Sequence, residues 1–276
     1  MNLGIAAAII AGSATATVAL MLALRRIAPE GGHFRDSDRA SSVLGFLGLG
    51  FAIVLGFVVL LAFEGYSNAK TKAETEATAV FEQYELAARF SPAKRRERVQ
   101  GELVCYARSV INEEWPAMKR GRTSPVAELW LERLEGEVRD RNAGSLEWFE
   151  DTDRRDEGRR GRLLEARSVL PTLLWVMLII GAAAVVAFIL LYADPTERPL
   201  GQVMFSGGVS ALVVVSLLVI SLLASPFQNQ DGSIKPASMR YSLGLIGREE
   251  ARLRQPLKPP CDQRGLPASD QPSSHS

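Results

Sequence analysis

Four long apolar segments without any ionisable side chain constrain the fold of this chain more than any other feature. They span residues 3–24, 43–63, 169–192 and 203–223, and none contains Asp, Glu, Lys, Arg or His. A helix rises about 1.5 Å per residue, so each segment reaches roughly 30 Å, the thickness of a hydrocarbon core. We therefore predict an all-α membrane protein with four transmembrane helices.

The first segment has an alternative interpretation as a secretory signal peptide. Its leading residues, Met1 and Asn2, carry no basic side chain. Its apolar stretch also exceeds the ~7–15 residues that are usual for a signal peptide. We interpret it as a retained helix.

The region between the second and third segments is hydrophilic, because 20 of the 32 Lys and Arg residues lie between Lys70 and Arg167. Its apolar residues recur at helical spacing, and no part shows sustained alternation, so a helical domain is expected. The second membrane helix should continue to Phe90. Further helices should start at Ser91-Pro92, with Ser91 as N-cap, and at Ser124-Pro125.

The helix that starts at Ser91-Pro92 should end near Trp115-Pro116, because proline disfavours helix at the residue before it. A last helix should run from Ser145 directly into the third membrane helix. Trp115 and Trp130 are expected to pack between the helices of this domain.

These patterns predict a division into four parts. Membrane helices one and two occupy residues 1–63, the helical hydrophilic domain 64–168, membrane helices three and four 169–224, and a C-terminal tail 225–276. Beyond about residue 254 the tail is rich in Pro, Ser and Gln. That composition is typical of disorder.

One face of the second membrane helix is a candidate pore lining. Phe46, Ile53 and Phe57 share this face with Glu64, which lies at the water boundary. Apolar constrictions can gate a pore by dewetting. The alternative, a packing or lipid-facing surface, is the more common use of such a stripe.

A basic cluster precedes the third membrane helix and is a candidate site for anions or lipid headgroups. Its members are Arg154, Arg155, Arg159, Arg160 and Arg162. A topology signal alone is the alternative. The interleaved acids Asp151, Asp153, Asp156 and Glu157 do not match a calcium loop, because Arg155 takes the third acidic position and Gly158 comes too late. A solvated charged helix is expected there.

Motifs for catalysis, cofactors and metals are absent from the sequence. The two histidines, His33 and His275, are far apart, and there is neither a phosphate-binding loop nor a dinucleotide fingerprint. We expect no enzyme activity, no cofactor and no metal site, and the net charge of +1 gives no reason to expect a nucleic-acid partner. Cys105 and Cys261 lie in different regions, and two unpaired thiols on a reducing side of the membrane are favoured over a disulfide.

Several segments, in order along the chain, resemble the bacterial bestrophin-like membrane family. They are GYSNAKTKAETEATAVFEQY, YARSVINEEWPAM, RLLEARSVLPTLLW and SPFQNQDGSIKPASM. The resemblance covers nearly the whole chain from the second membrane helix to Met239. The matching positions include Glu76, Glu114, Trp115, Pro116, Pro171, Trp175, Pro226 and Phe227.

The resemblance implies four membrane helices and no assigned activity. The family is distantly similar to bestrophins, pentameric chloride channels that line their pore with the second helix and keep both termini in the cytoplasm. Two hypotheses follow. One is a homo-oligomer in the lipid bilayer that conducts chloride or another anion, and the other is a non-conducting scaffold or sensor that binds a protein partner through its helical domain.

The basic residues near the membrane give conflicting signals about orientation. Arg25 and Arg26 follow a charge-free N-terminus, which favours an outside N-terminus by the positive-inside rule. Counting all membrane-proximal residues gives ten on the side of the helical domain against five on the other. The larger count and the resemblance together lead us to expect cytoplasmic termini and a cytoplasmic helical domain.

Overall fold

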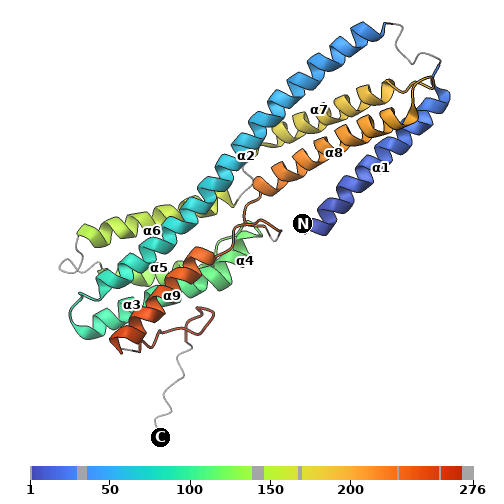
Figure 1. The fold of residues 1–276 in the computed structure, drawn as a ribbon. Coiled ribbons are helices and arrows are strands. Elements are labelled where there is room, and N and C mark those ends of the chain that lie inside the picture. Colours follow the sequence, from blue (N-terminus) through green and yellow to red (C-terminus); the bar gives the residue numbers. More distant parts are fainter. Residues whose placement is uncertain are drawn as a thin grey trace. The chain divides into compact units, whose positions relative to one another are not determined.

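The structure, a computed structural model, describes residues 2–29, 36–138, 146–166, 170–228, 230–254 and 256–268. Over these residues the chain forms helices and no strand, with one isolated bridge between Cys261 and Pro267. The prediction of an all-α fold is confirmed (Figure 1). The helices are α1 (Leu3–Ile27), α2 (Ser37–Ala87), α3 (Ala93–Ser109), the π-helix η1 (Val110–Glu114), α4 (Trp115–Met118), α5 (Pro125–Val138), α6 (Leu146–Glu165), α7 (Thr172–Leu191), α8 (Pro199–Leu223) and α9 (Ala237–Leu253).

Four of the described helices are long and apolar enough to cross a membrane, namely α1, α2, α7 and α8. The four predicted spans are thus confirmed as helices. The chain divides into two compact units. The membrane unit comprises residues 1–66, 168–225 and 229–233, and the helical unit comprises residues 67–167, 226–228 and 234–276.

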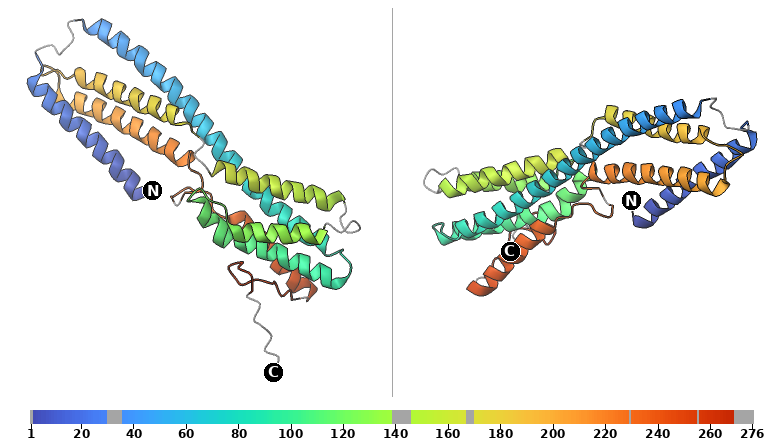
Figure 2. Two further views of the ribbon diagram at one scale, coloured as in Figure 1. Left: turned by 180° about the vertical axis from the view of Figure 1, so that it is seen from behind. Right: turned by 45° about the horizontal axis from the view of Figure 1, so that its top comes forward.

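Close packing in the membrane unit depends on small residues, as expected for helices in lipid. Helix α1 runs beside α8 (Figure 1, Figure 2), and a Cβ placed on Gly207 would lie 3.1 Å from Val18. Thr17 also donates a hydrogen bond to Ser210 at 2.9 Å across this contact. One apolar core of this unit gathers Val58, Ala62, Leu170, Leu178, Ile220 and Ala224.

Arg25, in the last turn of α1, holds the segment between α7 and α8. Its guanidinium donates to the Gln202 side chain at 3.0 Å and to the carbonyl of Pro195 at 2.9 Å, and it also contacts the carbonyl of Glu197. The C-terminal end of α1 and the α7–α8 connection therefore lie at the same end of the bundle.

The helical unit is built on the apolar faces that the sequence predicts. Helix α3 packs against α5 and α9, and Val99, Leu103 and Tyr106 are fully buried. Trp115 and Trp130 are buried as well, so their predicted packing between helices is confirmed. The predicted start of a helix at Ser124-Pro125 is also confirmed, since α5 begins at Pro125.

Four predicted helix boundaries are wrong. Helix α2 ends at Ala87 rather than Phe90, because Ala88, Arg89 and Phe90 donate to carbonyls three residues back in a tight final turn. Pro92, rather than Ser91, is the N-cap of α3.

The helix also continues through Trp115-Pro116, and a π-helical turn precedes this dipeptide. The amide of Trp115 donates to the carbonyl of Val110, five residues back. Pro116 has no backbone N–H and cannot donate a hydrogen bond to the preceding turn. The π-helical turn changes the hydrogen-bond pattern at this place, and the helix then resumes as α4 up to Met118.

The helix that precedes the third membrane helix does not run into it. Helix α6 ends at Glu165, and α7 begins at Thr172 with Pro171 as its N-cap at φ −57° and ψ 143°. Proline disfavours helix at the residue before it, so a new helix starts after Pro171. Ser145, where this helix was expected to start, lies outside the described residues.

The expectation of disorder beyond about residue 254 does not hold for residues 256–268. This segment, here called the C-terminal strap, is fixed by hydrogen bonds to α3, η1 and α5. In all three hydrogen bonds the strap contributes a backbone carbonyl, so its side-chain composition gave no sign of this order. Residues 269–276 lie outside the described part of the chain.

The contact between α6 and α2 generates a prediction about stability. A Cβ on Gly158 would lie 2.7 Å from the backbone nitrogen of Glu76, so Gly158→Ala forces two helix backbones apart. We expect a loss of roughly 1–3 kcal/mol in the free energy of unfolding, the usual effect of overpacking. Thermal unfolding of the detergent-solubilised protein, followed by circular dichroism, measures this.

Gly136→Ala is the matched control, because a Cβ at Gly136 in α5 meets no atom within 4 Å. Replacing a glycine inside a helix by alanine there should leave the stability unchanged or raise it by about 0.5–1 kcal/mol. Equal stability of the two variants would contradict the close α2–α6 contact.

Candidate functional site

The predicted pore-lining residues lie on the surface of the membrane unit. Phe46, Ile53 and Phe57 on α2 are 78%, 64% and 59% exposed, and Glu64 is exposed too. They are therefore not core residues of this chain. An apolar side chain in a bilayer can face lipid or another protein chain, so a role in a pore stays a prediction.

Glycines on α2 lie on open surface as well. A Cβ at Gly45, Gly48, Gly50 or Gly56 would meet no other atom within 4 Å. Gly45 and Gly56 are separated by about three turns and so share one flank beside the Phe46–Phe57 stripe. Among the described residues, no other helix makes the close approach that these glycines permit.

The arginines that were candidates for anions or lipid headgroups have a different environment. Arg155 and Arg162 are buried, and Arg159 is mostly buried. Buried charged side chains pair with other protein groups and are not available to lipid headgroups. The headgroup interpretation is therefore wrong for Arg155 and Arg162. Of the cluster, Arg154 and Arg160 are exposed. The expectation of a solvated helix also fails at Asp151, which is buried and paired with Arg154.

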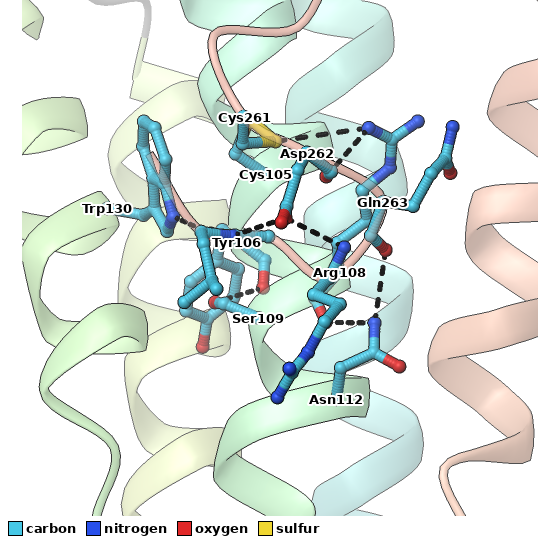
Figure 3. Close-up of a disulfide and its surroundings, with 12 residues drawn as sticks. Cys105, Tyr106, Arg108, Ser109, Asn112, Trp130, Cys261, Asp262 and Gln263 are labelled. Carbon is cyan, nitrogen blue, oxygen red and sulfur yellow. Dashed lines mark hydrogen bonds between the residues drawn. A yellow bond between two sulfur atoms is a disulfide. The ribbon is translucent and has the colours of Figure 1, made fainter. Parts of the chain in front are cut away.

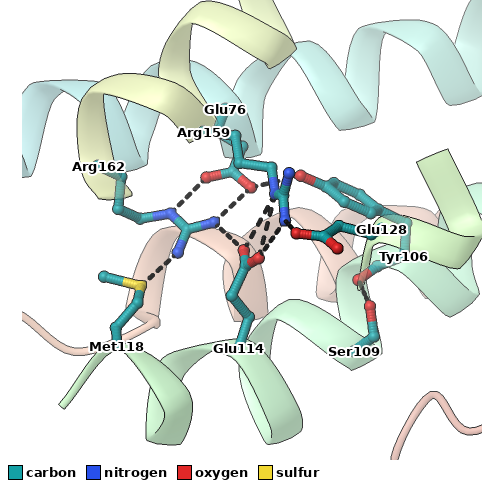
Figure 4. Close-up of polar contacts among 8 residues, drawn as sticks. All are labelled: Glu76, Tyr106, Ser109, Glu114, Met118, Glu128, Arg159 and Arg162. Carbon is teal, nitrogen blue, oxygen red and sulfur yellow. Dashed lines mark hydrogen bonds and ion pairs between the residues drawn. The ribbon is translucent and has the colours of Figure 1, made fainter. Parts of the chain in front are cut away.

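A buried ion-pair network, drawn in Figure 4, joins α2, η1 and α6 inside the helical unit. Arg162 binds Glu76 through two nitrogens, at 2.6 and 2.8 Å, and binds Glu114 at 2.6 Å. Arg159 binds Glu114 at 2.5 Å. The two guanidiniums and two carboxylates balance in charge, and their close geometry offsets the free energy lost when they leave water.

The network extends to neutral partners on two further elements, α3 and α4, and on α2 itself. Tyr106 on α3 donates to Glu76 at 2.7 Å, and Met118 on α4 contacts Arg162 through its sulfur. On α6, Arg155 donates to Gln83 at 3.1 Å. Because each buried charge has partners, the network fixes the relative positions of these helices.

Burial and neighbouring charges shift the pKa values of two network residues in opposite directions. Burial disfavours a charged Glu114, but Arg162 and Arg159 outweigh it and lower the pKa of this carboxyl below its ordinary value. Burial raises the pKa of Tyr106, and the nearby Glu76 and Glu114 raise it further, so Tyr106 remains a neutral donor.

Four of the family-motif residues meet at this network. Glu76 and Glu114 are its acids, and the ring of Trp115 lies 5.1 Å from the Arg162 guanidinium. Trp115 also packs edge-on against Phe227 at 5.5 Å and donates to the carbonyl of Ile234. The motif residues at these positions thus build the core of the helical unit. Pro116 follows the π-helix and Pro171 caps α7, whereas Trp175 packs against the core of the membrane unit.

The prediction of unpaired thiols is wrong. Cys105 on α3 and Cys261 on the C-terminal strap form a disulfide, with their Cα atoms 5.7 Å apart (Figure 3). The pairing spans 156 residues, so sequence spacing gave no sign of it. What brings the two sulfurs together is the docking of the strap.

The strap binds its support on both sides of Cys261. Trp130 donates to the carbonyl of Gly265 at 2.7 Å, and Arg108 donates to the carbonyl of Asp262 at 3.2 Å. Gly265 has φ +87°, and a Cβ there would overlap the backbone of Ser109. Glycine is therefore required at this contact.

Within the described ranges, no group of three or more His, Cys, Asp or Glu side chains is arranged to hold a metal ion. The buried carboxylates Glu76 and Glu114 are already bound by arginines. The helical unit therefore has a buried polar core, and the membrane unit has an exposed apolar face on α2.

A family model described as the Bestrophin-like domain matches residues 11–236. The chain belongs to the bestrophin-like family. A search of curated proteins finds no match.

Solved structures agree with this family fold. A bacterial bestrophin homologue from Klebsiella pneumoniae, solved by Zn-SAD phasing, superposes with a TM-score of 0.65 at 15% identity and covers 89% of this chain and 98% of its own. A point mutant of a bacterial bestrophin homologue from the same organism gives a TM-score of 0.65 at 14% identity, with 90% and 99% coverage. At such low identity these matches show that this bestrophin-like chain shares the fold.

The buried network of the bestrophin-like chain generates a prediction about acid stability. Glu114→Gln leaves Arg162 and Arg159 short of one negative charge, and breaking a buried pair costs about 3–5 kcal/mol. The lowered pKa of Glu114 stabilises the fold above the ordinary carboxyl pKa of about 4.3, and this contribution is lost as the pH falls through the folded-state pKa. The stability difference between wild type and variant should therefore be large at pH 7 and should narrow below about pH 4.3.

Glu74→Gln is the control, since Glu74 lies on α2 two residues before Glu76 and makes an exposed ion pair with Lys70 at 3.9 Å. Such pairs contribute about 0–1 kcal/mol, so little change is expected at any pH. Thermal unfolding at several pH values measures both variants. A Glu114→Gln protein as stable as Glu74→Gln at pH 7 would contradict the role of the network.

Proposed function

We propose that this protein is a homo-oligomeric membrane channel for anions in which α2 lines the pathway. The observation that carries the proposal is the unpartnered face of α2. Its bulky residues Phe46, Ile53 and Phe57 are all more than half exposed, although they belong to a compact four-helix unit. Membership of the bestrophin-like family supports a channel, and the resemblance to bestrophins suggests chloride or a similar anion.

Assembly around an axis explains the two kinds of residue on this face. Bulky apolar side chains would point toward the axis and form a narrow ring that excludes water when closed. Gly45 and Gly56 lie on the flank of the stripe and would allow the neighbouring copy of α2 to approach closely. Glu64 lies at the end of the stripe, where it would meet water.

The source of anion attraction differs from the one the sequence suggested. Arg155, Arg159 and Arg162 are committed to carboxylates in the helical unit, so they offer little free positive charge. Arg154 is exposed but also pairs with Asp151 and Glu82, so anion preference would then depend on exposed residues such as Arg160 and on the pore itself. The alternative function, a scaffold or sensor that binds a protein partner, requires neither a ring of α2 helices nor ion flux.

The first prediction concerns conduction. The double substitution Ile53→Ala, Phe57→Ala should widen the apolar constriction and increase chloride efflux from proteoliposomes relative to wild type. Because both side chains are exposed in the isolated chain, the variant should keep its fold and its α-helical circular dichroism.

Leu178→Ala is the control, because Leu178 is fully buried in the core of the membrane unit. This change should lower stability by roughly 2–5 kcal/mol without raising efflux. If well-folded wild type and double variant both carry no flux, the channel is excluded and the scaffold remains.

A second prediction concerns assembly. Gly56→Leu adds a side chain where a single copy has open space, so the fold of each copy should survive. Between two α2 helices the same side chain would block close approach and reduce the oligomer, as measured by native mass spectrometry. Gly12→Leu on α1, which also faces open space, should leave the oligomer intact. An unchanged oligomer in Gly56→Leu would exclude α2 as the helix that joins copies.

A further inference from the structure

The disulfide between Cys105 and Cys261 joins α3 to the C-terminal strap inside the helical unit. Non-covalent contacts of the strap lie on both sides of Cys261 and add to the bond. Pro260 packs against Gly101, where a Cβ would lie 3.0 Å from its ring, and Gly265 packs against Ser109. Cys105 itself is fully buried. The fold therefore positions both thiols for oxidation and shields the resulting bond.

Such a bond identifies the compartment in which the helical unit lies. Disulfides form and persist in oxidising compartments, whereas thiol reductants of the cytoplasm keep cysteines reduced. Both cysteines of this chain are used in the bond. A stable pairing is expected on the side of the membrane opposite the cytoplasm.

The short connections of the membrane unit point independently to the same orientation. Arg25 and Arg26 end α1, Arg39 lies in the first turns of α2, and Arg198 precedes α8. The hydrogen bonds of Arg25 to the α7–α8 connection place these basic residues at one end of the bundle. Arginine in short connections marks the cytoplasmic side.

The basic residues of the helical unit are weaker evidence for orientation. They belong to a segment, residues 67–167, that is longer than the roughly 60 residues over which the positive-inside rule operates. Long domains cross the membrane largely regardless of their charge. The larger number of basic residues on the side of the helical unit therefore does not decide the orientation.

We propose that the helical unit and both chain termini face the oxidising side of the membrane, with Arg25, Arg26, Arg39 and Arg198 on the cytoplasmic side. This orientation is the reverse of the one expected from the full count of basic residues and from the family resemblance. It does not depend on whether the protein conducts ions.

Formation of the bond follows ordinary disulfide exchange. Cys261 is partly exposed and can therefore be reached by another protein, and the Arg108 guanidinium lies 3.9 Å from its sulfur. The Cys261 thiolate attacks the disulfide of a dithiol oxidoreductase of that compartment, giving a mixed disulfide. The Cys105 thiolate then attacks the Cys261 sulfur and releases the oxidoreductase as a dithiol. The two electrons pass to the oxidoreductase, and the two cysteines give up two protons in total.

Thiol trapping on the full chain in intact bacterial cells tests the bond. The cells are quenched with acid, the precipitated protein is denatured and its free thiols are blocked with a maleimide, and after reduction the released thiols are labelled with a polyethylene-glycol maleimide. We expect two adducts on wild type and none on Cys261→Ser. Wild type without adducts would mean free thiols in the cell and would overturn the proposal.

Reporters fused to the C-terminus of the full chain test the orientation separately. Alkaline phosphatase, which is active outside the cytoplasm, should be active, and a green fluorescent protein, which matures inside it, should be dark. The same pattern is expected for Cys261→Ser, because orientation does not require the bond. A fluorescent fusion with inactive phosphatase would overturn the proposal even if the disulfide is found.

Discussion

The helical unit depends on the burial of one cation, Arg162. A fully buried guanidinium is tolerated only with close negative partners, because the free energy lost on leaving water is several kcal/mol per ion. Glu76 from α2 and Glu114 from η1 supply those partners, and Arg159 balances the second carboxylate. These ion pairs hold α2, η1 and α6 together, because each charge has its partners only when all three helices are in place.

This requirement explains irregular features around the network. Gly158 allows α6 to approach the backbone of α2 closely enough for Arg162 to bind Glu76 through two nitrogens. The π-helix η1 carries Glu114 and changes the helix geometry immediately before Pro116. π-Helical turns often occur at functional sites, but here the turn is explained by the position of a buried carboxylate.

The membrane unit follows a different physical rule. Its helices carry no buried ion pair at the α2 stripe, and lipid tolerates apolar surface that water would not. An exposed stripe of Phe46, Ile53 and Phe57 is therefore stable in a single copy. Its function depends on whether lipid or another copy of the chain covers it. The disulfide-bonded strap shows a third kind of constraint, in which a covalent bond and several hydrogen bonds hold a segment without regular secondary structure.

The sequence by itself determined the four membrane helices, the all-α class and the apolar faces of the helical unit. These follow from local periodicity and from the rule that backbone groups in hydrocarbon must be satisfied within helices. It also identified Glu76, Glu114 and Trp115 through their resemblance to family motifs, but it could not say that they meet.

Only the tertiary structure decided which arginines are buried, that Cys105 pairs with Cys261, and that residues 256–268 dock on the helical unit. A cluster such as Arg154–Arg162 has the same local pattern whether it faces water or carboxylates on distant helices. Burial of a charge, pairing of thiols 156 residues apart and docking of a strap are contacts between segments remote in sequence. Local periodicity carries no information about such contacts, because they exist only once the helices have packed.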